Sequence, residues 1–98
     1  MKDVPLIGDS YRLIDEGCIP GVSFRNLEYA EKDIDFANDL DYNLKMIAFD
    51  AQTSGGLLFS APSEKVENIL DDLKKSELTE SRVIGSAIEF EGKFIYLK

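Results

Sequence analysis

The sequence predicts an α+β fold in which a mixed or antiparallel sheet packs against helices. Segments with helical spacing of apolar residues alternate with short β-rich runs, which is typical of layered packing of helices on a sheet. The last two β-rich runs are separated only by Glu91-Gly92, a candidate two-residue hairpin turn. Hydrophobic residues make up 44% of the 98 residues and are spread along the chain, which indicates one continuous domain with a core.

The first element is predicted to be a helix from about Pro5 to Glu16. Gly17 is a plausible stop signal for this helix. The segment 18–23 is predicted to be a loop, because Pro20-Gly21 disfavours both a helix and a central strand. The apolar residues that recur at helical spacing in the first element are Leu6, Ile7, Tyr11, Leu13 and Ile14.

The middle of the chain combines an ambiguous stretch with a second predicted helix. Within residues 24–38, short extended pieces are expected around Tyr29, Ile34 and Phe36. Asp39 and Asp41 are candidate N-caps for a helix that runs through Phe49, because a carboxylate can accept a free N–H of the first turn. The residues of this helix that are expected to face inward are Leu40, Leu44, Ile47 and Ala48.

The second half begins with a polar loop over residues 50–56 and a short buried strand over residues 57–61. Pro62-Ser63 then opens the clearest helix of the chain, which extends to residue 75. Two further strands are predicted over residues 82–90 and 93–97. The helix has a continuous apolar stripe of Val66, Ile69, Leu70 and Leu73, with Glu64 and Glu67 near its start and Lys74 and Lys75 near its end, as the helix dipole favours.

Composition excludes several classes of function. The net charge is −8, with 19 acidic and 11 basic residues, which opposes binding to nucleic acid or to an anionic membrane. No apolar run is long enough to span a bilayer, and a cytoplasmic protein is expected. The absence of histidine excludes imidazole bases and histidine metal ligands. The single cysteine, Cys18, is expected to be a small buried apolar residue and not a catalytic thiol.

The acidic side chains are expected to be solvated or to act as caps. Asp71 is predicted to pair with Lys75 one helical turn later. The pairs Asp33/Asp35 and Asp39/Asp41 would chelate Mg²⁺ only if folding brought them together, so solvation and capping are the expected roles. No catalytic residue and no resident metal site are assigned to the chain.

The loop over residues 50–56 is the most distinctive candidate site. Its sequence is Asp50-Ala51-Gln52-Thr53-Ser54-Gly55-Gly56, which places hydroxyls and glycines in a turn before an apolar run. Glycines permit positive φ and close approach of another group, and consecutive N–H groups can form an anion-binding nest. Asp50 could bind a metal or accept N–H bonds from Gln52 or Thr53. The alternative, from the residues alone, is an ordinary connection that turns the chain.

A second stretch, residues 17–26, ends in Arg25 and Asn26. The amide of Asn26 could contact a phosphate or brace the other loop; alternatively Asn26 caps the next element and Arg25 is a surface charge. Gly21 and Asn26 are the candidate supporting residues of this stretch.

Together these motifs resemble the C-terminal part of the selenophosphate synthetases (selenide, water dikinases). That family has a Pro-Gly-Gly loop followed by an asparagine, then Asp-Pro-Gln-Thr-Ser-Gly-Gly-Leu-Leu, a helix and a terminal strand region. The matching positions here, in order, are Pro20-Gly21, Asn26, Asp50, the run Gln52 to Leu58, the helix over 63–75 and Val83-Ile84-Gly85. Ala51 stands where the family has proline, and Val22 where it has the second glycine of the loop, which predicts a local difference there.

The resemblance implies that residues 1–98 are the distal part of an aminoimidazole ribonucleotide synthetase-like C-terminal domain. Family enzymes convert ATP, selenide and water to selenophosphate, phosphate and AMP. They are Mg²⁺-dependent homodimers whose reactive Cys or selenocysteine lies in an N-terminal part that this sequence does not contain. The chain alone is therefore expected to be inactive and to bind neither ATP nor Mg²⁺. Its expected partner is the missing N-terminal part, and Asp50 to Gly56 would form a loop near phosphate or selenium species.

A competing hypothesis remains open from the sequence. The chain could be a free-standing, non-enzymatic module of the same fold that binds a partner or a small anion. Another member of the aminoimidazole ribonucleotide synthetase-like superfamily is less consistent with the run Gln52 to Gly56.

Overall fold

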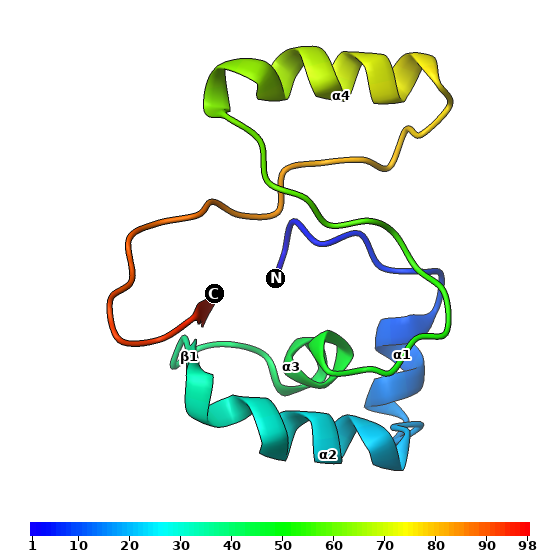
Figure 1. Cartoon of the computed structure of the whole chain (residues 1–98). Coiled ribbons are helices and arrows are strands. Elements are labelled where there is room, and N and C mark those ends of the chain that lie inside the picture. Colours follow the sequence, from blue (N-terminus) through cyan, green and yellow to red (C-terminus); the bar gives the residue numbers. More distant parts are fainter. The chain divides into compact units, whose positions relative to one another are not determined.

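The computed structural model describes all 98 residues and has an α+β composition (Figure 1). The chain divides into two compact units. The first unit comprises Met1, residues 6–55 and residues 89–98, and the second comprises residues 2–5 and 56–88. No helix is both long and apolar enough to cross a bilayer.

The helices and strands of the first unit are α1 (Ser10–Asp15), α2 (Gly21–Ala30), the 3₁₀ turn η1 (Glu31–Asp33), β1 (Ile34–Phe36), α3 (Tyr42–Ala48) and β2 (Ile95–Leu97). Helix α3 contacts both α1 and α2. Its start agrees with the predicted cap: the side chain of Asp41 accepts the N–H of Leu44 at 3.0 Å, whereas Asp39 caps nothing. The predicted stop at Gly17 is also present, since Gly17 has φ of +86°.

The first helix is shorter than predicted. It begins at Ser10, so Leu6 and Ile7 precede it in an irregular segment and Ile7 is largely exposed. Ile14 is the buried residue of α1. The apolar spacing before Ser10 therefore did not indicate helix, because Pro5 and Gly8 (φ +42°) favour a turn there.

Helix α2 corrects the prediction of a loop over residues 18–23 and of an extended piece at Tyr29. Pro20 has φ of −59° and stands immediately before the first helical residue, where a proline costs no hydrogen bond. Gly21 and Val22 are already helical, and neither has a positive φ. Pro-Gly thus starts a helix here, and valine in place of the second glycine causes no backbone strain.

The sheet also differs from the prediction. Strands β1 and β2 pair in parallel, with Ile34, Asp35 and Phe36 opposite Ile95, Tyr96 and Leu97. The extended pieces expected at Ile34 and Phe36 are therefore confirmed, and so is a strand within residues 93–97. The antiparallel hairpin at Glu91-Gly92 is wrong, because residues 82–90 form no strand. Gly92 does turn the chain, with φ of +99°.

The core of the first unit is small. The buried apolar side chains are Ile14, Ile34, Met46 and Phe49, and Met46 has no exposed surface. The ring of Phe36 lies against Phe49, with 6.2 Å between centroids, and the ammonium of Lys45 lies 4.0 Å from the Phe36 centroid. Of the residues predicted to face inward from α3, Ala48 is exposed, and the most buried residue, Met46, was not among them.

The second unit contains one long helix. Residues Ser63–Lys65 form the 3₁₀ turn η2, which continues as α4 (Val66–Lys75), so the predicted helix and its charge arrangement are confirmed. Its ion pair joins Lys75 to Asp72 at 3.0 Å, not to Asp71; both spacings are neighbours on a helix. This pair also raises the pKa of Lys75.

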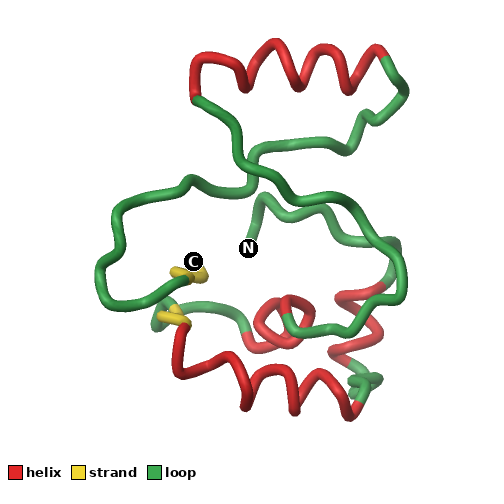
Figure 2. The backbone as a smooth tube through the Cα atoms, in the orientation of Figure 1, coloured by secondary structure: helices red, strands yellow, loops and turns green.

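The strand predicted over residues 57–61 does not form, and Figure 2 shows loop between α3 and η2 and between α4 and β2. Leu57, Leu58 and Phe59 are exposed instead of buried, with Leu57 at 95% of its maximum. A strand requires a neighbour that accepts its backbone hydrogen bonds. No segment of this chain pairs with residues 57–61, so the apolar run alone does not make a strand.

Candidate functional site

The loop that follows α3 is held at its first residue by one face of α2. Asn26 donates its amide Nδ2–H to the carbonyl of Phe49, with 3.0 Å between the atoms. Ser23, one turn earlier, is fully buried, and its hydroxyl lies at 3.5 Å from Oδ1 of Asp50, the outer limit of a hydrogen bond. The structure thus places Asn26 at the beginning of the loop, as in the predicted alternative in which Asn26 braces this loop.

The sequence predicts this arrangement only in part. Ser23 and Asn26 are three residues apart and therefore lie on one face of a helix. Because residues 18–23 were expected to form a loop, that spacing carried no signal. Gly21, the other predicted supporting residue, is the exposed first residue of α2.

The loop itself is irregular and exposed from Ala51 to Gly56. Asp50 accepts no N–H from Gln52 or Thr53, so the predicted turn cap is not formed. Gly55 and Gly56 do not have positive φ, so the loop lacks the alternation that an anion-binding nest uses. A Cβ on Gly55 would meet Oε1 of Gln52 at 3.0 Å, whereas a Cβ on Gly56 would meet nothing within 4 Å.

An open hollow lies between this loop and the start of α1. It measures about 460 Å³, and its polar lining is Asp9, Ser10, Asp50, Gln52, Thr53 and Ser54. Ile7 and Leu13 supply its apolar lining. Four of the predicted loop residues therefore share one concave surface with the first residues of α1, which the sequence did not single out.

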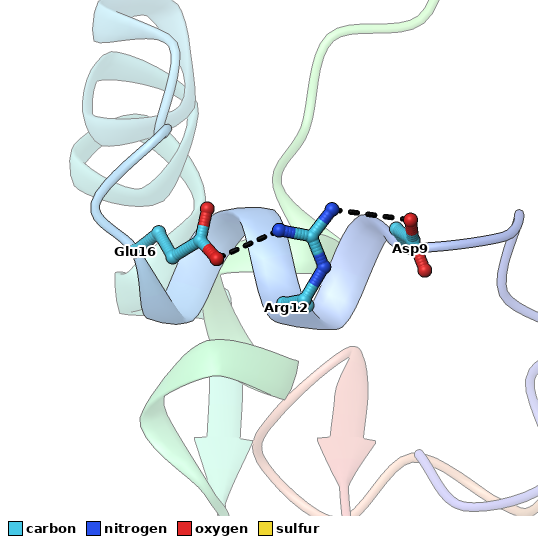
Figure 3. A network of polar contacts seen from close by, with 3 residues as sticks. All are labelled: Asp9, Arg12 and Glu16. Atoms are coloured by element: carbon cyan, nitrogen blue, oxygen red, sulfur yellow. Dashed lines mark hydrogen bonds and ion pairs between the residues drawn. The ribbon is translucent and has the colours of Figure 1, made fainter.

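The one basic residue of α1, Arg12, already forms two ion pairs. Figure 3 shows Arg12 between two carboxylates, with its guanidinium 2.7 Å from Oε1 of Glu16 and 3.1 Å from Oδ2 of Asp9. These contacts, first to Glu16 and then to Asp9, raise the pKa of Arg12. The lining of the hollow itself contains two carboxylates and no lysine or arginine.

Other candidate groups do not assemble into a site. No group of three or more Cys, Asp or Glu side chains is arranged to hold a metal ion. Cys18 is exposed, contrary to the prediction that it would be buried, because it lies in the turn after Gly17 where no element covers it. Asp41 serves as a cap and also accepts the hydroxyl of Tyr11 at 3.1 Å.

Comparisons with known proteins agree with the motifs in the sequence. The chain is 33% identical over 94 residues to selenide, water dikinase of Clostridioides difficile, covering 96% of this chain and 27% of that protein. It is 35% identical over 91 residues to the enzyme of the same name from Porphyromonas gingivalis, covering 92% and 26%. For that of Aliarcobacter butzleri, the identity is 30% over 96 residues, covering 98% and 28%.

These matches confirm the resemblance and limit its extent. The chain matches the C-terminal portion of selenophosphate synthetase over nearly all of its own length. It spans only about a quarter of the length of these curated relatives. No family model matches the chain, and no solved structure matches it.

Proposed function

We propose that this chain is the distal C-terminal part of a selenophosphate synthetase, an enzyme that converts ATP, selenide and water to selenophosphate, phosphate and AMP. The observation that carries the proposal is the match of 92–98% of the chain to proteins named selenide, water dikinase. ATP, Mg²⁺ and the homodimeric state belong to the full-length enzyme in this proposal. The separate chain is inactive and resides in the cytoplasm.

The chain's partner in this proposal is the remaining part of the enzyme. The exposed apolar residues Leu57, Leu58 and Phe59 support it, since a contiguous exposed apolar segment is typical of a surface that another segment covers. The apolar stripe of α4 supports it too, because none of its residues is buried. A separate binding module of the same fold would need to leave this surface open to water.

Within the full-length enzyme, the loop over residues 50–56 is the part of this chain that lies nearest the reacting groups. Its support is the bracing of Phe49 and Asp50 by α2, which fixes the beginning of the loop while the residues after it remain exposed. Such a loop can present backbone N–H groups and hydroxyls to a phosphate or selenium species. Gly55 and Gly56 then serve close approach by another group, not a left-handed backbone.

Substitution of Gly56 in a full-length relative tests this role. A Cβ at Gly56 would have no atom of this chain within 4 Å, and Gly56 does not have a positive φ, so Gly56→Val is expected to preserve folding. Turnover is expected to fall by about 100-fold or more, as displacement of a reacting group by about an ångström does. The measurement is selenide-dependent formation of AMP.

The matched control is the equivalent of Gly85→Val, which also adds a side chain in open space at a glycine without positive φ. This control is expected to retain turnover. Normal turnover of the Gly56 variant would overturn the role of the loop. Equal losses in both variants, with intact folding of each, would show that the effect is not specific to the loop.

A further inference from the structure

A pair of exposed aromatic rings lies in the turn that precedes β2. Phe90 is 66% exposed and Phe94 is 77% exposed, yet their rings pack on each other with 5.1 Å between the centroids. Gly92 permits this contact, because its φ of +99° turns the chain between the two phenylalanines. Aromatic side chains that lie together and open to water are typical of a surface that binds another molecule.

The turn that carries this pair is attached to η1 and β1. The backbone N–H of Phe94 donates to the carbonyl of Asp33, with 2.9 Å between the atoms. Strand β2 follows at once and pairs with β1. All of these residues belong to the first unit. The turn over residues 89–94 therefore lies beside the segment 31–36 within one compact body.

Carboxylates outnumber basic groups in these two segments. Residues 31–36 and 89–94 contain five acidic and two basic side chains. None of the five carboxylates forms an ion pair, because the ion pairs of Arg12, Lys75 and Arg82 are made with other carboxylates. The five are Glu31, Asp33, Asp35, Glu89 and Glu91. The surroundings of the aromatic pair are therefore net negative.

This charge limits the kind of molecule that the surface can bind. Nucleic acid and an anionic membrane carry the same sign of charge and are repelled. A second copy of the chain, with its own net charge of −8, is repelled as well. The chain has three arginines, and two of them, Arg12 and Arg82, are already in ion pairs. A guanidinium group from a different molecule suits the surface, since it stacks on an aromatic face and pairs with a carboxylate.

The same charges distinguish this surface from one that is permanently covered. The cores of permanent interfaces are depleted of charged residues, because unpaired carboxylates lose free energy when they leave water. Residues 51–63, which include the exposed apolar residues 57–59, contain no charged side chain. The turn over residues 89–94 alternates glutamates with phenylalanines instead. This second pattern suits a transient partner that brings its own positive charge.

From these observations we propose that the turn over residues 89–94 is a docking site for an arginine-rich segment of a separate protein. Phe90 and Phe94 receive the guanidinium groups and the aliphatic stems of the arginines, and the surrounding carboxylates neutralise their charge. Such a small, charged interface binds weakly and is sensitive to salt. The inference does not depend on the proposed function, because the rings and the charges belong to this chain.

Titration of the ¹⁵N-labelled 98-residue chain with a capped six-residue peptide of alternating arginine and leucine tests the proposal. The amides of residues 31–36 and 89–94 are expected to shift, and the affinity is expected to fall about threefold or more when salt is raised from about 50 to about 300 mM. The same peptide with lysine in place of arginine is expected to bind at least about threefold more weakly. No shift of these amides, or equal affinity for the two peptides, would overturn the proposal.

Variants at exposed positions sharpen the test. Phe90→Ala is expected to weaken binding of the arginine peptide at least about fivefold, and Glu91→Gln at least about twofold. The matched controls are Phe59→Ala and Glu67→Gln, which change an exposed phenylalanine and an exposed glutamate outside the two segments and are expected to bind as the original chain does. Glu91→Gln remains informative if Phe90→Ala fails to fold. Equal losses in the variants and their controls would overturn the proposal.

Two further measurements address the other occupants of this surface. A full-length enzyme that ends in this sequence is expected to bind the arginine peptide with an affinity within about twofold of that of the chain. Loss of binding there would show that the rest of the enzyme covers the turn, which would overturn the assignment to a separate protein. Shifts of the same amides when the chain alone is concentrated would indicate a second copy and would overturn it too. Turnover is not a readout here, so failure of this inference and failure of the proposed function are distinguishable.

Discussion

The two units of the chain differ in whether their apolar side chains are covered. In the first unit, Ile14 of α1, Ile34 of β1 and Met46 of α3 are buried. In the second unit, α4 has a continuous apolar stripe, yet none of its residues is buried. An amphipathic pattern therefore specifies a helix in both cases, but only the first unit supplies the surfaces that cover it.

The largest expected difference is in the free energy of unfolding, between a substitution in the buried core of the first unit and one in the apolar stripe of α4. Met46→Ala removes a fully buried side chain and is expected to lower the free energy of unfolding by about 2–5 kcal/mol. Leu70→Ala in α4 is expected to cost less than about 1 kcal/mol, because its side chain is only partly covered and alanine is a strong helix former. Urea unfolding measures both.

Far-UV circular dichroism is the probe for that experiment, because it reports the helices of both units, whereas all four tyrosines, at positions 11, 29, 42 and 96, belong to the first unit. If Met46→Ala does not fold, Met46→Leu keeps the volume and is expected to cost less than about 1.5 kcal/mol. Similar losses for Met46→Ala and Leu70→Ala would contradict the distinction between a covered and an uncovered apolar face.

The need for a partner segment also explains which elements the sequence predicts correctly. The helix over residues 63–75 and the cap at Asp41 are local, because their signals lie within one or two turns of the residues that they order. The strand over residues 57–61 and the hairpin at Glu91-Gly92 require a partner strand, and local pattern does not identify one. The strand pair that does form joins β1 to β2, which lies near the end of the chain.

The candidate site divides in the same way. The loop residues Asp50 to Gly56 are recognisable as a family motif in the sequence, and the similarity to selenide, water dikinases agrees with that motif. Ser23 in α2, which lies against Asp50, and Ser10 in α1, which lines the same hollow as the loop, are far from the loop in sequence and come near it only through tertiary packing. Ordinary serines carry no sequence signal of such a contact.

A smaller effect is expected from the cap that only the first unit has. Asp41→Ala removes the acceptor of the Leu44 N–H and also the acceptor of the Tyr11 hydroxyl, so it is expected to lower stability by about 1 kcal/mol or more; Tyr11→Phe gives the share that belongs to the hydroxyl. Asp39→Ala is the matched control: this neighbouring carboxylate caps nothing, so a change within about 0.5 kcal/mol is expected. Helix α4 has no side-chain cap at its N-terminus and no comparable position. Equal effects of the two substitutions in urea unfolding would show that the cap contributes nothing.

The smallest expected effect is a pH dependence of stability in the first unit. It arises from a hydrogen bond between α1 and the start of α3. The hydrogen bond that Tyr11 of α1 donates to Asp41, at the start of α3, is the main cause that raises the pKa of Tyr11 above its ordinary value of about 10. The folded chain therefore holds the phenolic proton more tightly than the unfolded chain. This contribution is fully present below the ordinary pKa and is lost as the pH rises through the folded pKa.

Tyr11→Phe is expected to remove this alkaline loss of stability, measured as the difference in urea midpoint between about pH 9 and about pH 11. Lys75→Gln is the comparison in the second unit. Its partner, Asp72, lies on the same helix, so the pair orders no contact between elements. The raised pKa of Lys75 is therefore expected to leave the tyrosine-detected alkaline transition of the first unit unchanged. An unaltered pH dependence in Tyr11→Phe would show that the titration of Tyr11 does not contribute to the stability of the first unit.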